Sequence, residues 1–313
     1  MAQTKIKLGF AGTPYLAFQH FQELCSAEHN EVKFILTQPT KRVGRGLSLE
    51  NNYFQDIPSN IDLFQPSSLD DKEFEGTLKK YEIDLLVVVA YGKIIPEWLL
   101  KLPKYGCLNV HFSLLPKWRG ASPIQRAIQN GDKETGISFM QLEKEMDTGP
   151  VYKQIKIPLR RVDFFEVEQM LVQESLANLN EVVFDIVQNS LNSSPQDDNA
   201  ATYANKIDKS EGLVDFKMHG LEIINQFNAF KRWPQSTVQI NGELVKLIDI
   251  EFIPLMHGEI GCVESFTPTS LNIFCSDGVI KINSLQFPGK KPIASNDLFN
   301  SKRDIIHAGE KLA

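Results

Sequence analysis

The chain has 313 residues, of which 42% are hydrophobic and 23% charged, and its formal net charge is −6. This composition is that of an ordinary globular protein, and the length allows two domains. No apolar run approaches the roughly 18 residues of a transmembrane helix, and Met1–Lys5 leaves no room for a signal peptide before the first strand-like run. We therefore expect a cytoplasmic protein. Its acidic balance gives no sign of nucleic-acid binding, so any such surface must be a local patch.

Apolar runs alternate with a helical pattern in the first part of the chain. Such near-continuous apolar strands, separated by helices, predict a mainly parallel sheet covered on both faces. Gly9 and Gly12 do not form the G-x-G-x-x-G pattern, so the glycine turn after the first strand is not a dinucleotide fingerprint. The expected elements are strands at 5–12, 32–36 and 83–90 and a helix from Tyr15 to about Ser26.

A fourth short strand, 107–110, leads to two polar side chains on one face, Asn109 and His111. An amide can donate to a developing oxyanion and an imidazole can carry a proton near neutral pH, which together suit acyl transfer. Asp147 lies in a Gly-Pro loop after another apolar strand, where its carboxylate could orient the imidazole. The alternative is that Asn109 is a turn residue and His111 a core histidine.

Two loops carry further candidates. Residues 113–116 form an apolar turn-forming loop, followed by a basic segment and a helix from about Ser122. Ser113 lacks the G-x-S-x-G elbow and Cys107 suits the core, so neither predicts a covalent step.

The four cysteines (Cys25, Cys107, Cys262, Cys275) show no paired spacing and are expected to be buried thiols. The loop at 37–50 is basic, and a solvated mobile loop is the alternative to a binding role.

The character of the chain changes near residue 190. Residues 162–191 have a helical pattern with one apolar stripe, and 189–201 is polar and without periodicity, as in an interdomain linker. Beyond it, short alternating segments separated by Asn241-Gly242 and Asp277-Gly278 turns predict a small antiparallel barrel or sandwich. We place the domains at 1–189 and 206–313, joined by 190–205.

Several short motifs are spread over nearly the whole chain. They are Ala11-Gly12-Thr13-Pro14, Thr37-Gln38-Pro39, Val87–Gly92, Asn109-Val110-His111, Ser113-Leu114-Leu115-Pro116, Trp118-Arg119-Gly120, Asp147-Thr148-Gly149 and Pro288-Gly289-Lys290-Lys291. In this order they resemble the motifs of methionyl-tRNA formyltransferases, within the folate-dependent formyltransferases. The resemblance implies a Rossmann-like catalytic domain and an OB-like C-terminal barrel. It also implies formyl transfer from 10-formyltetrahydrofolate to the α-amine of methionyl initiator tRNA, by a monomer without a metal or a membrane partner.

The same resemblance implies three groups of site residues. The catalytic group is Asn109, His111 and Asp147. The folate-binding group is Val88, Ala90, Tyr91, Gly92, Ser113, Leu114, Leu115 and Pro116. The tRNA-binding group is Lys41, Arg42, Arg45, Lys206, Lys209, Lys290 and Lys291. Phe112 departs from the family, which has a small residue there; an aromatic ring either packs under the loop or crowds the site.

Two other functions share parts of this pattern. Another folate-dependent formyltransferase, acting on an amino sugar-nucleotide or a ribotide, would use the same Asn109, His111 and Asp147. Against it stand the basic Gly44-Arg45-Gly46 loop and the C-terminal barrel. A non-enzymatic nucleic-acid module built on the barrel would have no use for a proton-transfer set.

Overall fold

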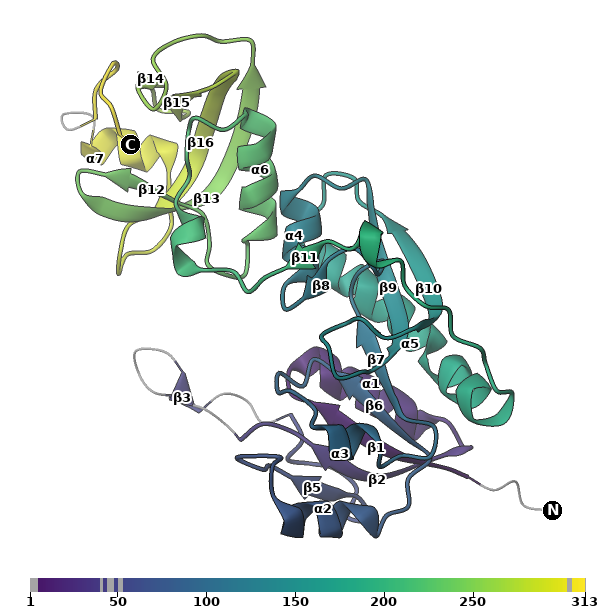
Figure 1. Cartoon of the computed structure of the whole chain (residues 1–313). Coiled ribbons are helices and arrows are strands. Elements are labelled where there is room, and N and C mark those ends of the chain that lie inside the picture. The colour runs from purple at the N-terminus through teal and green to yellow at the C-terminus, as the bar shows by residue number, and fades with distance from the viewer. Residues whose placement is uncertain (1–4, 40–41, 44–47, 50–52, 303–305, 313) are drawn as a thin grey trace. The chain divides into compact units, whose positions relative to one another are not determined.

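The computed structural model describes residues 5–39, 42–43, 48–49, 53–302 and 306–312 (Figure 1). The chain divides into two compact units. The first unit comprises 1–120, 135–157 and 169–203, and the second comprises 121–134, 158–168 and 204–313. The predicted α/β class is confirmed, with a mainly parallel sheet in the first unit and an antiparallel sheet in the second. Within the described residues no helix is both long and apolar enough to cross a membrane.

A seven-stranded sheet organises the first unit, in the order β10-β9-β7-β6-β1-β2-β5. The five strands from β7 to β5 pair in parallel, whereas β9 runs antiparallel to β7. The strands are β1 (Ile6–Gly12), β2 (Asn30–Leu36), β5 (Asp62–Phe64), β6 (Leu85–Val89), β7 (Cys107–His111), β9 (Glu134–Gln141) and β10 (Val151–Pro158).

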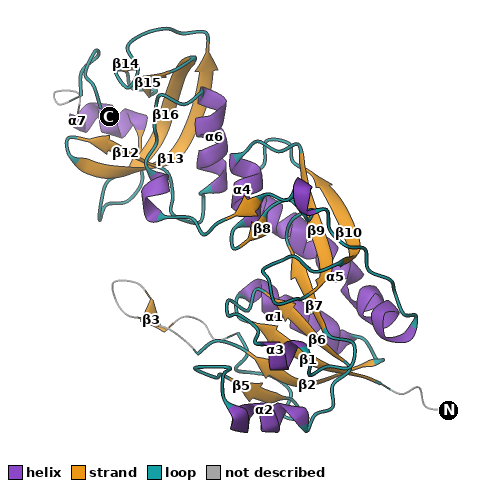
Figure 2. Cartoon of the chain, viewed as in Figure 1, coloured by secondary structure: helices purple, strands orange, loops and turns teal. Residues whose placement is uncertain are grey.

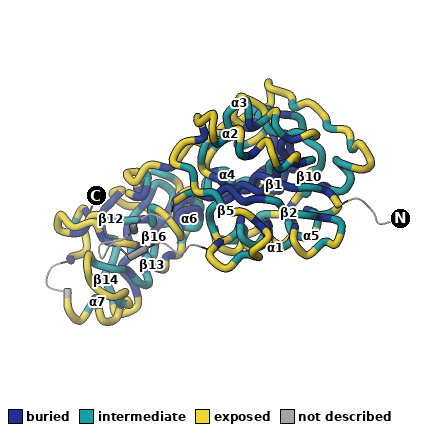
Figure 3. The backbone as a smooth tube through the Cα atoms, turned by 90° about the horizontal axis from the view of Figure 1, so that it is seen from below, coloured by how far each residue is buried: buried dark blue, intermediate teal, exposed yellow. Residues whose placement is uncertain are grey.

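Helices cover both faces of this sheet, as the apolar strands predicted (Figure 2). On one face lie α1 (Tyr15–Ser26) and α5 (Phe164–Gln188). There the ring of Phe21 on α1 packs against that of Phe10 on β1, with 5.9 Å between the ring centroids. On the other lie α2 (Lys72–Lys79) and α3 (Glu97–Leu100), which bury Leu78 and Leu99. Every residue of β6 is consequently buried, and the central strands are the most deeply covered part of this unit (Figure 3).

The parallel strands set the position of the site. β1, β6 and β7 are neighbours that run in the same direction, so their carboxyl ends meet at one edge of the sheet. Ligands of open α/β sheets bind beyond this edge. His111 is the last residue of β7, and the segment after β6 turns through positive φ at Ala90 (46°) and Gly92 (75°).

The second unit is built on an antiparallel sheet in the order β12-β13-β16-β15-β14, with β17 beside β16. Its hairpin β12–β13 turns through Asn241 and Gly242 at φ 50° and 77°, as the Asn-Gly pair predicted. Among the described strands β12 and β14 form the two ends, so the sheet is a half-barrel. The strands are β12 (Thr237–Ile240), β13 (Glu243–Pro254), β14 (Val263–Phe266), β15 (Leu271–Cys275), β16 (Gly278–Gln286) and β17 (Ile293–Ala294).

The described part of the second unit also contains the helices α4 (Pro123–Gln129), α6 (Gly220–Ala229) and α7 (Ser295–Lys302). α6 packs on β13 and β16 and also lies against α4. Arg126 on α4 forms a bidentate salt bridge with Glu211, with N–O distances of 2.6 and 3.0 Å. The helix expected from Ser122 therefore belongs to the second unit, although it comes early in the chain.

The remaining elements are short. β3 (Arg42–Val43) pairs with β4 (Ser48–Leu49), β8 (Arg119–Gly120) pairs with β11 (Tyr203–Ala204), and two 3-10 turns cover Asp198–Ala200 and Lys209–Gly212. Cys107, Cys262 and Cys275 are buried thiols, as predicted. The prediction was wrong for Cys25, which is exposed because it lies in the last turn of α1, beside the buried stripe that ends at Leu24.

Candidate active site

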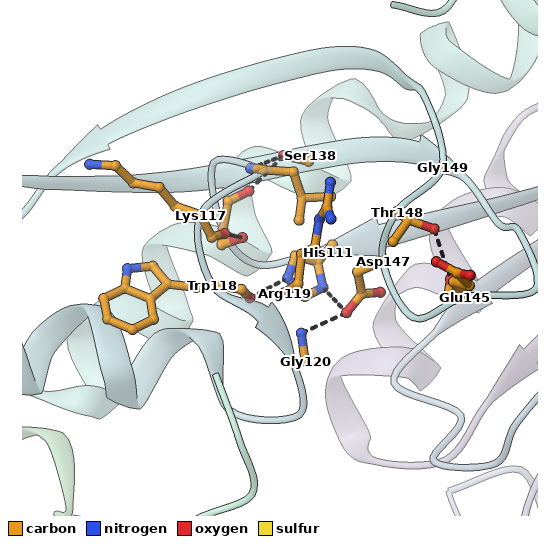
Figure 4. Close-up of polar contacts among 12 residues, drawn as sticks. His111, Lys117, Trp118, Arg119, Gly120, Ser138, Glu145, Asp147, Thr148 and Gly149 are labelled. Carbon is orange, nitrogen blue, oxygen red and sulfur yellow. Dashed lines mark hydrogen bonds and ion pairs between the residues drawn. The ribbon is translucent and has the colours of Figure 1, made fainter. Parts of the chain in front are cut away.

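The end of β7 and the loop after β9 bring an imidazole and a carboxylate together. Nδ1 of His111 lies 3.7 Å from Oδ2 of Asp147 (Figure 4). Both residues are buried, with 7% and 8% of their surface exposed. The distance is too long for a hydrogen bond and suits an ion pair with room to tighten. The topology thus unites two residues that are 36 positions apart in sequence, by the difference of their numbers.

The other ring nitrogen of His111 meets the backbone. Nε2 lies 3.0 Å from the carbonyl oxygen of Trp118. A carbonyl only accepts, so Nε2 carries the hydrogen in this contact. Nδ1 faces the carboxylate of Asp147, so each ring nitrogen has a polar neighbour. His111 is therefore not a core histidine packed among apolar side chains.

Backbone geometry fixes the direction of the Asp147 carboxylate. The N–H of Gly120 donates to Oδ2 over 2.8 Å. Asp147 itself has φ 55°, a left-handed conformation that aspartate tolerates better than most residues. A Cβ on Gly149 would lie 1.9 Å from the carbonyl oxygen of Gln141, so the turn after Asp147 requires glycine there. The Asp-Thr-Gly motif is thus a tight turn that returns a carboxylate to the end of β7.

Asn109 lies in the middle of the same strand. It pairs in register with Val88 on β6 and Met140 on β9, which excludes a turn position. Alternation along β7 puts its side chain on the face of His111. Asn109 is half-buried, in contrast to the fully buried Leu108 and Val110 beside it. The Asn109 side chain therefore lies on the same face of β7 as His111 of the His111–Asp147 dyad.

Hydrogen bonds to residues of β9 and β10 and within the loop itself fix the loop 113–116. Ser113 is fully buried and its Oγ donates to the carbonyl of Lys117 over 2.6 Å. Oγ of Ser138 donates to the carbonyl of Ser113 (2.7 Å) and accepts from the N–H of Leu115 (3.0 Å). The amide of Gln154 donates to the carbonyl of Leu115 over 2.7 Å. The hydroxyl of Ser113 is therefore bonded within the loop, and the fixed loop presents Leu114 and Pro116, which are half-buried.

Two neighbours of the dyad are also accounted for. Burial raises the pKa of the Cys107 thiol to about 12, which excludes a thiolate nucleophile near neutral pH. Phe112 is buried, and its ring centroid lies 6.2 Å from that of His20 on α1. The aromatic ring therefore packs beneath the loop, on the face opposite His111, and does not crowd the site.

The segment after β6 offers backbone to a ligand. The carbonyl of Tyr91 accepts from Thr13 Oγ1 (3.0 Å) and Gln38 Nε2 (2.8 Å). The ring of Tyr91 is buried, and burial raises the pKa of its phenol to about 12. A Cβ on Gly92 would lie 2.5 Å from Gln38 Nε2, so glycine allows this close approach. Val88 is buried, whereas Ala90 and Gly92 are exposed beside the end of β7.

The basic candidates lie elsewhere. Lys206, Lys209, Lys290 and Lys291 are all exposed in the second unit. Lys290 follows a turn in which Gly289 has φ 71° and the N–H of Lys290 donates to the carbonyl of Phe287 over 3.1 Å. Lys41 and Arg45 lie outside the described residues, and of Arg42 only the backbone, in β3, is described.

Sequence reasoning missed the groups that hold the dyad. The Trp118 carbonyl and the Gly120 N–H are backbone groups, which carry no side-chain signal. Ser138 and Gln154 come from β9 and β10, and only the fold brings them under the loop. Gln196, whose amide donates to the carbonyls of Asp147 and Gly149, sits in the predicted linker. In the described parts of the chain no three His, Cys, Asp or Glu side chains are grouped as metal ligands would be.

Known proteins resemble this chain over nearly its whole length. The chain matches the formyl transferase family over residues 6–181 and the formyl transferase C-terminal domain over 206–303. It is 35% identical over 307 residues to the methionyl-tRNA formyltransferase of Ectopseudomonas mendocina (strain ymp), covering 97% of each chain.

Solved structures at lower identity share the fold. One is WlaRD, a sugar 3N-formyl transferase crystallised with dTDP and 5-N-formyl-THF. It superposes with a TM-score of 0.65 at 21% identity, over 91% of this chain and 99% of WlaRD. Another is HypX from Aquifex aeolicus in complex with tetrahydrofolic acid, with a TM-score of 0.64 at 15% identity over 96% of this chain. The chain spans about half of HypX, 48% of its length. Because of the 35% identity over nearly the whole chain and the two domain matches, the chain belongs to the methionyl-tRNA formyltransferase family.

Proposed function

We propose that this enzyme transfers the formyl group of 10-formyltetrahydrofolate to the α-amine of methionine esterified to initiator tRNA. The observation that carries the proposal is the position of His111, with one ring nitrogen on the Trp118 carbonyl and the other facing Asp147. The family relationship supplies the substrates. A folate co-substrate is supported by the 5-N-formyl-THF present in the WlaRD structure.

The reaction makes three demands on the site. The attacking amine must be neutral, and an α-amine with a pKa near 8 is already partly so at neutral pH. Attack on the formyl carbon places negative charge on its oxygen. A proton must then pass from the attacking nitrogen to the folate nitrogen that leaves. No side-chain nucleophile is required, which agrees with the buried Ser113 and Cys107.

The three polar residues meet these demands as a group. We assign the Asn109 amide as a donor to the oxyanion, because Asn109 is half-buried and shares a face of β7 with His111. The Nδ1–H of His111 would be the second donor, from the gap that separates it from Asp147. Asp147 would hold the imidazole in its protonated form and help to move the proton, directly or through water. One oxyanion donor typically contributes about 3 kcal/mol to the barrier reduction.

The folate would be held mainly by backbone. Ala90 and Gly92 turn the chain through positive φ at the end of β6, and the locked loop 113–116 lies next to it in the sheet order. In both segments internal hydrogen bonds fix the backbone, at the carbonyls of the buried residues Tyr91 and Leu115. Peptide groups held in this way can recognise the amide-like edge of a pterin ring without reorganisation.

We propose that the second unit binds the tRNA. We infer that its antiparallel sheet is an OB-like module, a fold often used for nucleic acids, in a domain spanning 206–313 after a catalytic domain of 1–189. The exposed Lys206, Lys209, Lys290 and Lys291 would contact phosphates, together with Lys41, Arg42 and Arg45 of the 37–50 loop. A tRNA substrate also implies that the enzyme works in the cytoplasm.

A formylation assay tests the proposal. Purified protein is mixed with 10-formyltetrahydrofolate and with methionyl initiator or methionyl elongator tRNA, and formyl-methionine is measured after deacylation. We expect formylation of the initiator and far less of the elongator. The same assay with a dTDP-linked amino sugar tests the alternative acceptor, which the WlaRD likeness raises. Formylation of the sugar and not of the tRNA would contradict the proposal.

A further inference from the structure

The side chain of Gln196 uses both ends of its amide at the site. Its Oε1 accepts from Nε and Nη2 of Arg119, at 3.0 and 2.9 Å. Its Nε2 donates to the backbone carbonyls of Asp147 (2.8 Å) and Gly149 (2.7 Å). An amide has two N–H donors, and both are spent on the turn that carries the carboxylate. Gln196 is half-buried although its neighbours on both sides, Pro195 and Asp197, are exposed.

Arg119 extends this contact to the imidazole. It is 3% exposed and also pairs with Asp198, whose Oδ1 lies 2.7 Å from Nη2. Its neighbours in sequence bond to the two residues of the dyad. The carbonyl of Trp118 lies within hydrogen-bond distance of His111, and the N–H of Gly120 donates to Asp147. A buried guanidinium needs acceptors, so the position of this segment depends on Gln196 and Asp198. One glutamine therefore contacts the segment behind His111 and the turn of Asp147 together.

The stretch around Gln196 is itself fixed to the first unit. Ser194 exchanges two backbone hydrogen bonds with Val151, of 2.8 and 2.9 Å. Thr202 accepts from the N–H of Arg119 with its carbonyl and from the N–H of Trp118 with its hydroxyl, each over 2.9 Å. The polar stretch predicted as a plain linker is thus attached to the site at residues 194–202, just before the chain enters the second unit.

We propose that Gln196 is a positioning residue of the formyl-transfer reaction, which clamps the Asp147 turn through Nε2 and the Arg119 segment through Oε1. The inference rests on the proposed function of His111 and Asp147. Asp147 is held at a left-handed φ and 3.7 Å from its partner, so a small release of the turn changes the geometry of the dyad. A displacement of about 1 Å at a catalytic group can cost on the order of 10²-fold in rate.

The substitution Gln196→Glu separates the two ends of the amide. Glutamate keeps an acceptor for Arg119 but cannot donate to the carbonyls of Asp147 and Gly149. Gln196→Ala removes both contacts. We expect kcat to fall by roughly 10- to 100-fold in both variants while KM for tRNA and for folate changes less than about threefold. The matched control is Asn192→Ala, which removes an exposed amide from the same stretch and should behave as wild type.

Hydrogen exchange of the full-length protein gives a readout that needs no activity. Peptides that contain residues 118–120 and 145–150 should exchange faster in Gln196→Ala, and those of 145–150 faster in Gln196→Glu, with no change in Asn192→Ala. If the wild type formylates no methionyl-tRNA, the proposed function fails, and the exchange result still decides on the clamp. A Gln196→Glu enzyme with wild-type kcat, or unchanged exchange at 145–150, would overturn the inference. A 10- to 100-fold rise in KM for folate or tRNA in the Gln196 variants, with no loss of kcat, would also overturn it.

Discussion

Gly120 donates its backbone N–H to Oδ2 of Asp147, the same oxygen that lies 3.7 Å from Nδ1 of His111. A fixed backbone dipole therefore holds one oxygen of the carboxylate, in addition to any attraction by His111. Two roles of Asp147 can be separated as a result. Its oxygen anchors the turn by accepting from Gly120, and its negative charge acts on the imidazole.

Asp147→Asn keeps the first role and removes the second, because an amide oxygen can still accept from the Gly120 N–H. We expect kcat to fall by about 10²- to 10⁴-fold, the usual range for a group in acid–base catalysis. KM for folate and tRNA should remain nearly unchanged, since ground-state contacts are kept. Steady-state kinetics with each substrate varied in turn will measure both quantities.

The control is Asp185→Asn on α5, where the carboxylate likewise accepts one hydrogen bond, from Asn189. It should keep wild-type kinetics. A folded Asp147→Asn enzyme with near wild-type kcat would show that the charge plays no part in the reaction. A raised KM for folate at constant kcat would instead make Asp147 a ligand of the ground state.

Asn109, His111 and Asp147 should also behave as one unit in double substitutions. Asn109→Ala and His111→Ala each remove a donor, and we expect each to lower kcat. Combined with Asp147→Asn, the losses should fall short of the sum of the single effects, because each group acts through the same intermediate. Double-mutant cycles on kcat measure this coupling, and strictly additive losses would argue for three independent roles.

Much of the first unit could be predicted from local pattern. The strands at 32–36 and 83–90 and the helix from Tyr15 lie within about two residues of their observed bounds, because apolar runs and helical period are local properties. The pairing of Asn109 with His111 on one face follows from strand alternation. That Asp147 could orient His111 was suggested by its place in a Gly-Pro loop after an apolar strand and by the resemblance. The backbone contacts of its turn with Gln141 and Gly120 follow only from the fold.

The rest depended on tertiary contacts that no local pattern records. α4 was expected within the catalytic domain but packs with α6, and its Arg126 pairs with Glu211, 85 positions away in sequence. The segment 189–201 lacks apolar periodicity, which predicted a plain linker. Polar hydrogen bonds hold part of it in place, and they leave no trace in hydropathy.

Limited proteolysis should reveal this difference within the polar segment. Residues 189–193 carry no contact with the site, whereas 194–202 bond to Val151, Arg119 and Trp118. We therefore expect a nonspecific protease at native pH to cut first within 189–193 and to spare 194–202. Mass spectrometry of early products will locate the cut. First cleavage between Gln196 and Thr202 would mean that these hydrogen bonds open readily.

The lysines of the Pro-Gly-Lys-Lys turn should contribute to tRNA affinity through phosphates. Lys290→Ala and Lys291→Ala should each weaken tRNA binding and reduce the slope of log K against log salt by roughly 0.7–0.9. The KM for folate should not change. Lys80→Ala, at an exposed position at the end of α2, is the control. Salt-dependent binding with methionyl initiator tRNA measures the slope, and an unchanged slope would leave the two lysines as solvated surface charge.

Acid should destabilise the protein through His20, which is fully buried between α1 and α5. Its Nδ1–H donates to the carbonyl of Leu16 over 2.6 Å and Nε2 lies 2.7 Å from Ser175 Oγ. Burial lowers the pKa of His20 from 6.5 to about 4, against a smaller opposing effect of the Leu16 carbonyl. The unfolded chain therefore takes up this proton near pH 6.5 and the folded chain only near pH 4.

Stability should consequently be lost as the pH falls from 6.5 to 4, by about 3 kcal/mol from this residue alone. His20→Gln has no proton to take up, so its free energy of unfolding should lose that much less over the same interval, whatever its stability at pH 7. Urea unfolding of both proteins at pH 7, 5.5 and 4 measures the difference of slopes. The control is His257→Gln, at an exposed position of the second unit, whose pH dependence should follow the wild type. Parallel curves for wild type and His20→Gln would show that His20 takes up its proton equally well in the folded and the unfolded chain.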